Sequence, residues 1–409
     1  MLEKQQSSLI VEYGILIIFV GFAINHRFSV LMIGLACLVS IFIVVNFHKR
    51  LQIGLKQLSI FISLICAFPL TKFLTSLLHD QFNELGRAID NPSRLLIMMP
   101  LVAILILWPV RQKIFIISLS LTSVLMGLNV ILHLEDKVIS LSYGSPIYLG
   151  AISSSLVVLN HLSRELVLSS ESRLIVFVNI AIFMGLIAVI ASGSKVAWCV
   201  VGLYMFVIFF REKIRPRRRL FILCASILLI FGINFFSNQL VYKKVEDILV
   251  NISCLVEDPY SRCSLGSIGV RAWILKSGVE KFVESPITGH GLGSSKFLIQ
   301  EDIQSGKLPK FDNPGNFHNE ILELLVTQGL LGVIGFMGMI GGVVLYVVKA
   351  SNITNNPYTK MLLLNIIIYL SLGLSQVLSY VSSVTTYFYF SSLILLGLSL
   401  SSKKNEPSH

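Results

Sequence analysis

Charged residues are scarce in this chain of 409 residues, since Asp, Glu, Lys and Arg make up 13% of it while 54% is hydrophobic. A soluble protein usually has about 25% charged residues and roughly 45–50% apolar ones. Half of the usual charge is too little to cover a globular surface with polar groups. The composition therefore excludes a soluble enzyme, a disordered chain and a nucleic-acid-binding domain. The net charge of +11 is instead typical of a membrane protein whose cytoplasmic loops are cationic.

Cysteines and metal-binding patterns are also scarce. Six cysteines are too few for a disulfide scaffold, and none of them forms a CxxC pair. The sequence has no DxD-like pair and no cluster of histidines and carboxylates, so we expect neither a metal nor another cofactor. Cys254 and Cys263 lie in the one long polar stretch, which we expect to face an oxidising compartment. We therefore predict a disulfide between them.

Long apolar runs make up most of the remaining sequence. A helix needs about 20 apolar residues to cross a bilayer. Twelve runs come close to that length: 8–25, 28–47, 57–78, 95–110, 114–133, 145–163, 174–192, 196–210, 220–236, 329–348, 361–378 and 385–400. The pattern predicts an all-α polytopic membrane protein of about 12 transmembrane helices, nine in residues 1–236 and three in residues 319–400. We expect the polar residues 237–318 to form a partly helical loop domain and residues 401–409 a tail.

The orientation follows from the short connections, because cytoplasmic loops carry an excess of Lys and Arg. With the N-terminus inside, most cations fall in cytoplasmic loops, above all in the basic run 211–219. We interpret this run as a topology anchor rather than a nucleic-acid site. Both termini are then cytoplasmic, and the loop 237–318 lies on the outer side of the membrane.

The first candidate site residue is Arg271. Apolar residues recur at helical spacing over residues 267–282, and Arg271 falls on the edge of that apolar stripe. A guanidinium on the packed side of a helix needs an anionic partner. It either pairs with a carboxylate of the loop or clamps a phosphate. The sequence leaves both alternatives open.

Three glycines alternate a little further along, where Gly289, Gly291 and Gly293 follow Pro286 and flank His290. The spacing resembles part of a dinucleotide fingerprint, but no βαβ unit surrounds it, which excludes that interpretation. The segment is either a plain tight turn or a place where a ligand approaches the backbone.

The third candidate segment surrounds His318. Asn316 can act as an N-cap, which would place His318 in the first turn of the next helix, where the dipole favours anions. A neutral imidazole beside an anion can act as a general base. Glu320 and Glu323 instead favour the protonated imidazolium of His318, so its protonation state stays open. The alternative is an interfacial histidine without a chemical role. Gly329 and Gly332, nearly on the same face, would let another helix pack closely.

Ionisable residues gather at one face of the predicted membrane domain. Arg87, Arg94, Lys195, Arg271 and His318 all map to the outer interface. Each of them alone can snorkel to water, but together they form a cationic pocket that suits a lipid-linked diphosphate. Transporters and flippases, which also fit twelve spans, tend to place charges at the bilayer midplane. The pattern therefore favours interfacial chemistry over transport.

The three motifs together resemble the O-antigen ligase and polymerase family of bacterial envelope glycosyltransferases. The resemblance rests on Gly269-Val270-Arg271, on Pro286-Ile287-Thr288-Gly289-His290-Gly291, and on His318-Asn319-Glu320 with Leu322, Gly329 and Gly332. Twelve spans with one large periplasmic loop before the last three are the family's layout. The resemblance implies a metal-independent transferase in the inner membrane of a Gram-negative bacterium, with its active site facing the periplasm. Its donor would be a glycan on undecaprenyl diphosphate.

The resemblance also implies roles for these residues. Arg271 would bind the diphosphate, His318 would orient it or activate the acceptor hydroxyl, and Arg94 would assist. Lys195 stands where the family usually has arginine, so it keeps the charge but loses the bidentate fork. The other predicted substrate-binding residues are Arg87, Gly289, His290, Gly291 and Asn319.

Two reactions fit this scaffold. A ligase transfers the glycan to the lipid A–core, whereas a polymerase extends the glycan itself. We prefer the ligase because the order of the loop, the His318 segment and the expected number of spans resemble it more closely. Cations that neutralise a leaving diphosphate can replace a metal. Attack opposite that leaving group would invert the anomeric centre.

Overall fold

The computed structural model describes residues 2–24, 26–133, 146–167, 172–211, 267–311, 315–350 and 356–404, together with three single residues between 242 and 249. These segments are almost entirely helical and contain no strand, which confirms the predicted all-α class for the described part of the chain. The helices of the membrane domain are α1 (Leu2–Ile24), α2 (His26–Leu78), α3 (Phe82–Met98), α4 (Pro100–Leu107), α5 (Gln112–Leu132), α7 (Pro146–Val167), α8 (Ser172–Ala191), α9 (Lys195–Arg211), α14 (Glu320–Ala350), α15 (Pro357–Gly373) and α16 (Ser382–Lys404). The others are α12 (Ser267–Glu284), α13 (Ser295–Gln304) and the short 3₁₀ helix η2 (Leu378–Tyr380).

Several of these helices are long and apolar enough to cross a membrane. The five segments that qualify are Ile89–Leu107, Gln112–Leu132, Ser172–Ala191, Glu320–Lys349 and Ser382–Ser402. Shorter apolar helices are Ser8–Ile24, Arg27–Ile41, Leu64–Leu78, Lys195–Phe210 and Pro357–Gly373. The protein is therefore a multi-pass membrane protein, but the predicted count of about 12 spans is not confirmed. The predicted run 220–236 lies outside the described residues, and α2 passes through two predicted runs as one helix.

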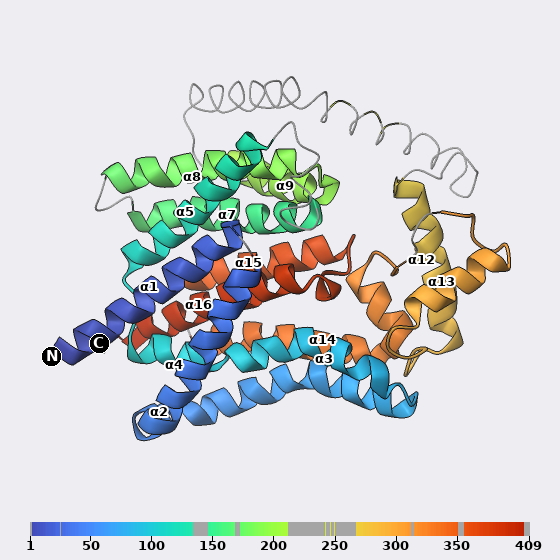
Figure 1. The fold of residues 1–409 in the computed structure, drawn as a ribbon, viewed down its shortest axis with the longest axis horizontal. Coiled ribbons are helices and arrows are strands. Elements are labelled where there is room, and N and C mark those ends of the chain that lie inside the picture. Colours follow the sequence, from blue (N-terminus) through green and yellow to red (C-terminus); the bar gives the residue numbers. More distant parts are fainter. Residues whose placement is uncertain are drawn as a thin grey trace.

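The helices lie roughly side by side and leave α12 and α13 at one end of the molecule (Figure 1). In this view α15 and α16 lie in the middle, with α5, α7, α8 and α9 on one side and α2, α3, α4 and α14 on the other. The beginning of α1 and the end of α16 lie at the end opposite α12 and α13. The predicted orientation of the two ends relative to the membrane stays a prediction.

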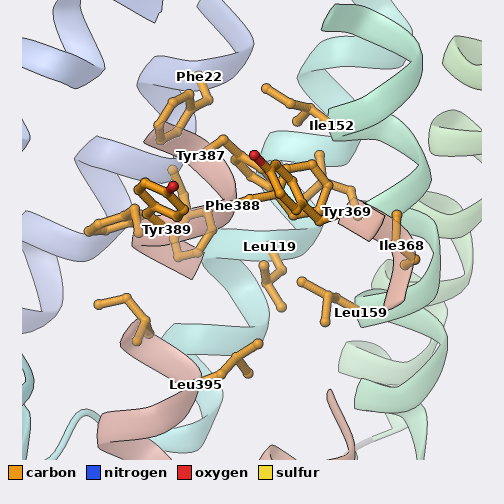
Figure 2. Packing of buried hydrophobic residues seen from close by; sticks show 14 of the residues in the cluster. Phe22, Leu119, Ile152, Leu159, Ile368, Tyr369, Tyr387, Phe388, Tyr389 and Leu395 are labelled. Atoms are coloured by element: carbon orange, nitrogen blue, oxygen red, sulfur yellow. The ribbon is translucent and has the colours of Figure 1, made fainter. Parts of the chain in front are cut away.

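The core of the membrane domain is aromatic around α16 (Figure 2). Tyr387 is fully buried, and its ring lies edge-on to Phe22 of α1, with 5.3 Å between the ring centroids. Its hydroxyl group hydrogen-bonds to that of Ser155 in α7, at 3.1 Å. Ser155 in turn donates to the side-chain oxygen of Asn365 in α15, at 2.6 Å. Aromatic packing and a chain of satisfied polar groups thus hold four helices together.

A second, smaller core holds the loop domain against α14. Its buried side chains come from α12, α13, the following loops and the start of α14: Ile274, Leu298, Ile299, Leu308, Phe317, Leu322 and Val326. Lys281 of α12 adds an ionic clamp, because its ammonium lies 3.6 Å from both Glu301 and Asp302 of α13. These contacts attach the predicted helical loop domain, as far as it is described, to the helix that carries the His318 segment.

Candidate functional site

The helix α14 is broken at Gly329, where φ is 64° and ψ is −157°. A break in a helix leaves carbonyl and N–H groups without their usual partners. The glycine-rich segment 285–291 supplies those partners. Four backbone hydrogen bonds join it to the break: His290 N to Val326 O (2.8 Å), Gly291 N to Thr327 O (2.9 Å), Leu330 N to Pro286 O (2.8 Å) and Leu331 N to Ile287 O (3.3 Å).

Glycine is needed on both sides of this contact. Gly289 has φ +65°, and a Cβ atom there would collide with the backbone of Thr327 and Gln328. A Cβ atom on Gly329 would collide with the backbone of Ile287. The turn predicted around His290 is therefore present, and it docks onto a broken helix. At Gly329 a loop packs closely, and not the second helix that the sequence predicts.

His290 has a structural place in this contact. Besides its backbone bond to α14, its Nε2 atom lies 2.7 Å from the carbonyl oxygen of Lys281. The backbone N–H of His290 thus connects the turn to α14, and its imidazole connects the turn to α12. Gly289, Gly291 and His290 were predicted as substrate-binding residues, and the structure places all three where the turn meets α12 and α14.

His318 lies just before α14 and not in its first turn. Its φ is +51°, which is unusual for a residue other than glycine, and its N–H donates to Oδ1 of Asn316 at 2.9 Å. Asn319 is the N-cap, since its Oδ1 atom accepts from the N–H of Leu322 at 2.9 Å. The prediction that Asn316 caps the helix is wrong, because the side chain of Asn316 closes a turn one step earlier. The side-chain nitrogen of Asn319 also donates to the carbonyl of Leu374, at 2.8 Å.

The imidazole of His318 is partly buried beside Arg271. Burial lowers the pKa of His318, and the positive charge of Arg271 lowers it further, whereas a hydrogen bond with Gln376 opposes both. Its Nδ1 atom is buried, and no hydrogen-bond partner for it occurs among the described residues. The ring is therefore neutral at pH 7, the state a general base requires.

Arg271 of α12 has no acidic partner in the segments that the structure describes. Burial lowers the pKa of its guanidinium, but arginine remains charged at neutral pH. Of the two alternatives that the sequence leaves open, the ion pair within the loop is thus not seen in this part of the chain. A half-buried, unpaired guanidinium beside His318 is able to bind an incoming anion.

A polar cavity of about 470 Å³ opens next to this segment. Its lining comes from α2, α3, α13, α14, α16, η2 and the loops around them: Lys72, Glu84, Asp90, Asn91, Leu292, Gly293, Ser295, Gly315, Glu323, Leu324, Thr327, Gln328, Ser379, Tyr380 and Ser382. Lys72 is 4% exposed, so the cavity contains a buried ammonium. Lys72 is not among the residues predicted from the sequence, although an ionisable residue inside an apolar run, here 57–78, is itself a signal of a functional site.

Glu323 ties the cavity to the segment before His318. One of its carboxylate oxygens accepts from the hydroxyls of Ser295 and Tyr380, the latter at 2.7 Å. The other accepts from the N–H of Phe317 at 2.9 Å. A single buried carboxylate thus joins α13, η2 and the turn that presents His318, which holds this turn in place.

Comparison with known proteins gives this arrangement a family. Residues 180–337 match the family model described as O-antigen ligase. This match supports an assignment to the O-antigen ligase family. The match includes Lys195, Arg271, the docked turn and His318. An uncharacterised protein of Haemophilus influenzae is 26% identical over 344 residues, which cover 80% of this chain and 79% of that protein.

Similarity to the O-antigen ligase family indicates a coarse function. The family supports an enzyme of glycosyl transfer whose partners are a lipid-linked glycan and a lipid acceptor. Among the described residues, no three His, Cys, Asp or Glu side chains gather as a metal site would require. The site itself contains cations, an imidazole, carboxylates and other hydrogen-bonding side chains.

Two other predicted cations lie elsewhere in the helix bundle. Arg94 of α3 is paired with Asp90 at 2.6 Å and donates to the hydroxyl of Thr386 at 2.7 Å, beside the cavity. Lys195 is the first residue of α9, which packs against α7, α8 and α15. In Figure 1, α9 and α3 lie on opposite sides of α15 and α16. The structure thus brings Arg271 and His318 together, whereas Arg94 and Lys195 belong to different sides of the helix bundle.

Three predicted residues have no side-chain description. Arg87 belongs to α3, but its side chain is not among the described parts of the chain. Cys254 and Cys263 lie outside the described residues. The predicted disulfide and the role of Arg87 stay predictions.

Proposed function

We propose that the protein is an O-antigen ligase, which transfers a glycan from undecaprenyl diphosphate to the lipid A–core. The reaction would take place at the periplasmic face of the inner membrane and invert the anomeric centre. The observation that carries the proposal is the pairing of Arg271, which lacks a carboxylate partner in the described segments, with His318, whose lowered pKa keeps it neutral. The family match supports the same chemistry in its coarse form.

The two residues divide the reaction between them. Arg271 binds the diphosphate and stabilises the negative charge that develops as the bond to the anomeric carbon breaks. The bond's electron pair leaves with the diphosphate. His318 takes the proton from the acceptor hydroxyl as that oxygen forms the new bond on the opposite face of the sugar. The site therefore separates a cationic place for the leaving group from a base for the nucleophile.

The burial of His318 serves this role. An imidazolium cannot accept a proton, and the nearby guanidinium makes the imidazolium less stable. The positive charge of Arg271, which binds the donor, thus also keeps His318 in the neutral form that can accept a proton. The side chain of Asn316, which accepts from the N–H of His318, and the carboxylate of Glu323, which accepts from the N–H of Phe317, hold His318 in its unusual backbone conformation.

The lipopolysaccharide of a deletion strain tests the proposal. Loss of a ligase leaves the core bare, and this is the result that we expect. Loss of a polymerase instead leaves the core with a single glycan repeat, which would replace the proposed acceptor by the growing glycan. An unchanged lipopolysaccharide pattern would reject both. Complementation with the wild-type chain and with His318→Ala serves as the matched control, and only the former should restore the full ladder.

A further inference from the structure

The buried lysine of α2 is the starting point. Lys72 is 4% exposed, and within the described part of the chain no carboxylate lies within ion-pair distance of its ammonium. Its contacts are the ring of Phe68, with the ammonium 4.9 Å from the ring centroid, and longer-range attraction to Glu320 and Glu323. A buried charge without a close partner is costly to fold. Such a residue in a membrane protein marks a functional site.

The lining of the cavity around Lys72 is rich in hydrogen-bond acceptors. The carboxylates of Glu84, Asp90 and Glu323 belong to it. Asn91 and Gln328 are both at least nine-tenths buried, and each has a buried amide oxygen for which the described residues supply no donor. A diphosphate would meet three carboxylates here. A sugar instead donates its hydroxyls to carboxylate and amide oxygens and accepts from the ammonium.

The cavity and Arg271 are separate neighbours of the His318 segment. Gly315 lines the cavity, and Glu323 in its wall binds the N–H of Phe317, the residue before His318. None of the lining residues belongs to α12, the helix that carries Arg271. The segment just before His318 thus contacts the wall of the cavity, while the imidazole itself lies beside Arg271. The volume of about 470 Å³ is in the range of small-ligand pockets, roughly 300–1,000 Å³.

We infer that this cavity is the acceptor subsite, which holds an uncharged, hydroxyl-rich sugar residue by hydrogen bonds to Lys72 and to the surrounding carboxylates and amides. The inference rests on the proposed function, since it assigns the nucleophilic hydroxyl to this side of His318 and the diphosphate to the Arg271 side. Lys72 binds the acceptor sugar and takes no part in proton transfer.

Binding of each substrate alone tests the subsite. The probes are the delipidated core oligosaccharide and a fluorescent undecaprenyl-diphosphate glycan, each titrated into the full-length protein in detergent. Lys72→Met keeps the length of the side chain and removes the ammonium. We expect it to weaken binding of the core oligosaccharide about tenfold or more and to leave donor binding unchanged. Lys296→Met, at an exposed position of α13, should change neither and is the matched control.

The outcomes separate the subsite from the proposed function. If Lys72→Met weakens donor binding instead, or if the wild type does not bind the core oligosaccharide, the acceptor subsite is refuted. If the oligosaccharide binds as expected but the purified wild type transfers no glycan to lipid A–core, the subsite stands and the proposed reaction is refuted. The melting temperature of Lys72→Met must match the wild type. If it falls, Glu84→Gln, which changes only a cavity carboxylate, replaces it and should weaken oligosaccharide binding alone.

Discussion

The buried side-chain amides of the membrane domain and of the site region differ in their hydrogen bonding. Inside the helix bundle, Asn365 binds Ser155 at 2.6 Å and Ser391 at 3.0 Å, so both ends of its amide have partners. At the cavity, Asn91 donates to the carbonyl of Ser379, yet its amide oxygen has no donor among the described residues, and neither has that of Gln328. Buried polar groups are usually satisfied. The amides of the bundle thus serve packing, whereas those of the site are available to a ligand.

The largest effect should follow from His318→Ala, because the proposed mechanism makes His318 the general base. As a general base it accelerates proton transfer by about 10²–10⁴, and the variant should lose that factor in the transfer rate at saturating donor. Single-turnover assays with lipid-linked glycan and lipid A–core measure it. His133→Ala, a histidine at the end of α5, is a control that should keep the wild-type rate. Transfer by His318→Ala at the wild-type rate would show that the base lies elsewhere.

Arg271→Ala should have the next largest effect, and on donor affinity. A hydrogen bond to a charged group contributes about 1.5–3 kcal/mol, so the dissociation constant of the lipid-linked diphosphate should rise by roughly 10–100-fold. Fluorescence binding in detergent measures the change. Glu280→Ala, on the exposed surface of the same helix, is the control. Unchanged donor affinity in Arg271→Ala would leave the guanidinium with a structural role only.

Gly289→Ala should destabilise the docked turn. Alanine in the left-handed region costs about 1–2 kcal/mol, and here the new Cβ atom also collides with the backbone of α14. Gly306→Ala measures the cost of the left-handed backbone alone, because Gly306 has φ +78° but open space around its Cβ position. Melting temperatures of the two variants should rank wild type, Gly306→Ala, then Gly289→Ala. Equal losses in both variants would mean that the docking against α14 contributes nothing.

The smallest effect is a shift of the pH profile. The pKa of His318 lies below its ordinary value of about 6.5 because of burial and Arg271. The transfer rate should therefore be constant above neutral pH and fall only as the pH drops through this lowered pKa, where the base becomes protonated. Removing the positive charge in Arg271→Ala should raise the pKa and move the acidic limb to higher pH. A shift to lower pH would contradict the coupling of the two residues.

The helix bundle and the site also differ in how far the sequence predicts them. The apolar runs predicted a helical membrane protein, because hydrophobic periodicity is a local property of the sequence. The sequence motifs, which are also local, predicted Arg271 and His318 as the main candidates for the site. The break at Gly329 could not be predicted, since the run 329–348 is apolar without interruption and the break is stabilised by a turn about 40 residues earlier. Lys72 does carry a local signal, as a charge inside an apolar run, but the cavity around it could not be predicted. The residues that line this cavity come from α2, α3, α13, α14, α16, η2 and loops, and only the tertiary fold brings them together.

The double variant Arg271→Ala/His318→Ala provides the most direct test of the division of roles. If Arg271 acts on donor binding and His318 on the acceptor proton, the double variant should bind the donor as weakly as Arg271→Ala alone. At saturating donor it should transfer as slowly as His318→Ala alone. The account is contradicted if His318→Ala by itself weakens donor binding as much as Arg271→Ala does, because His318 would then be a second ligand of the diphosphate.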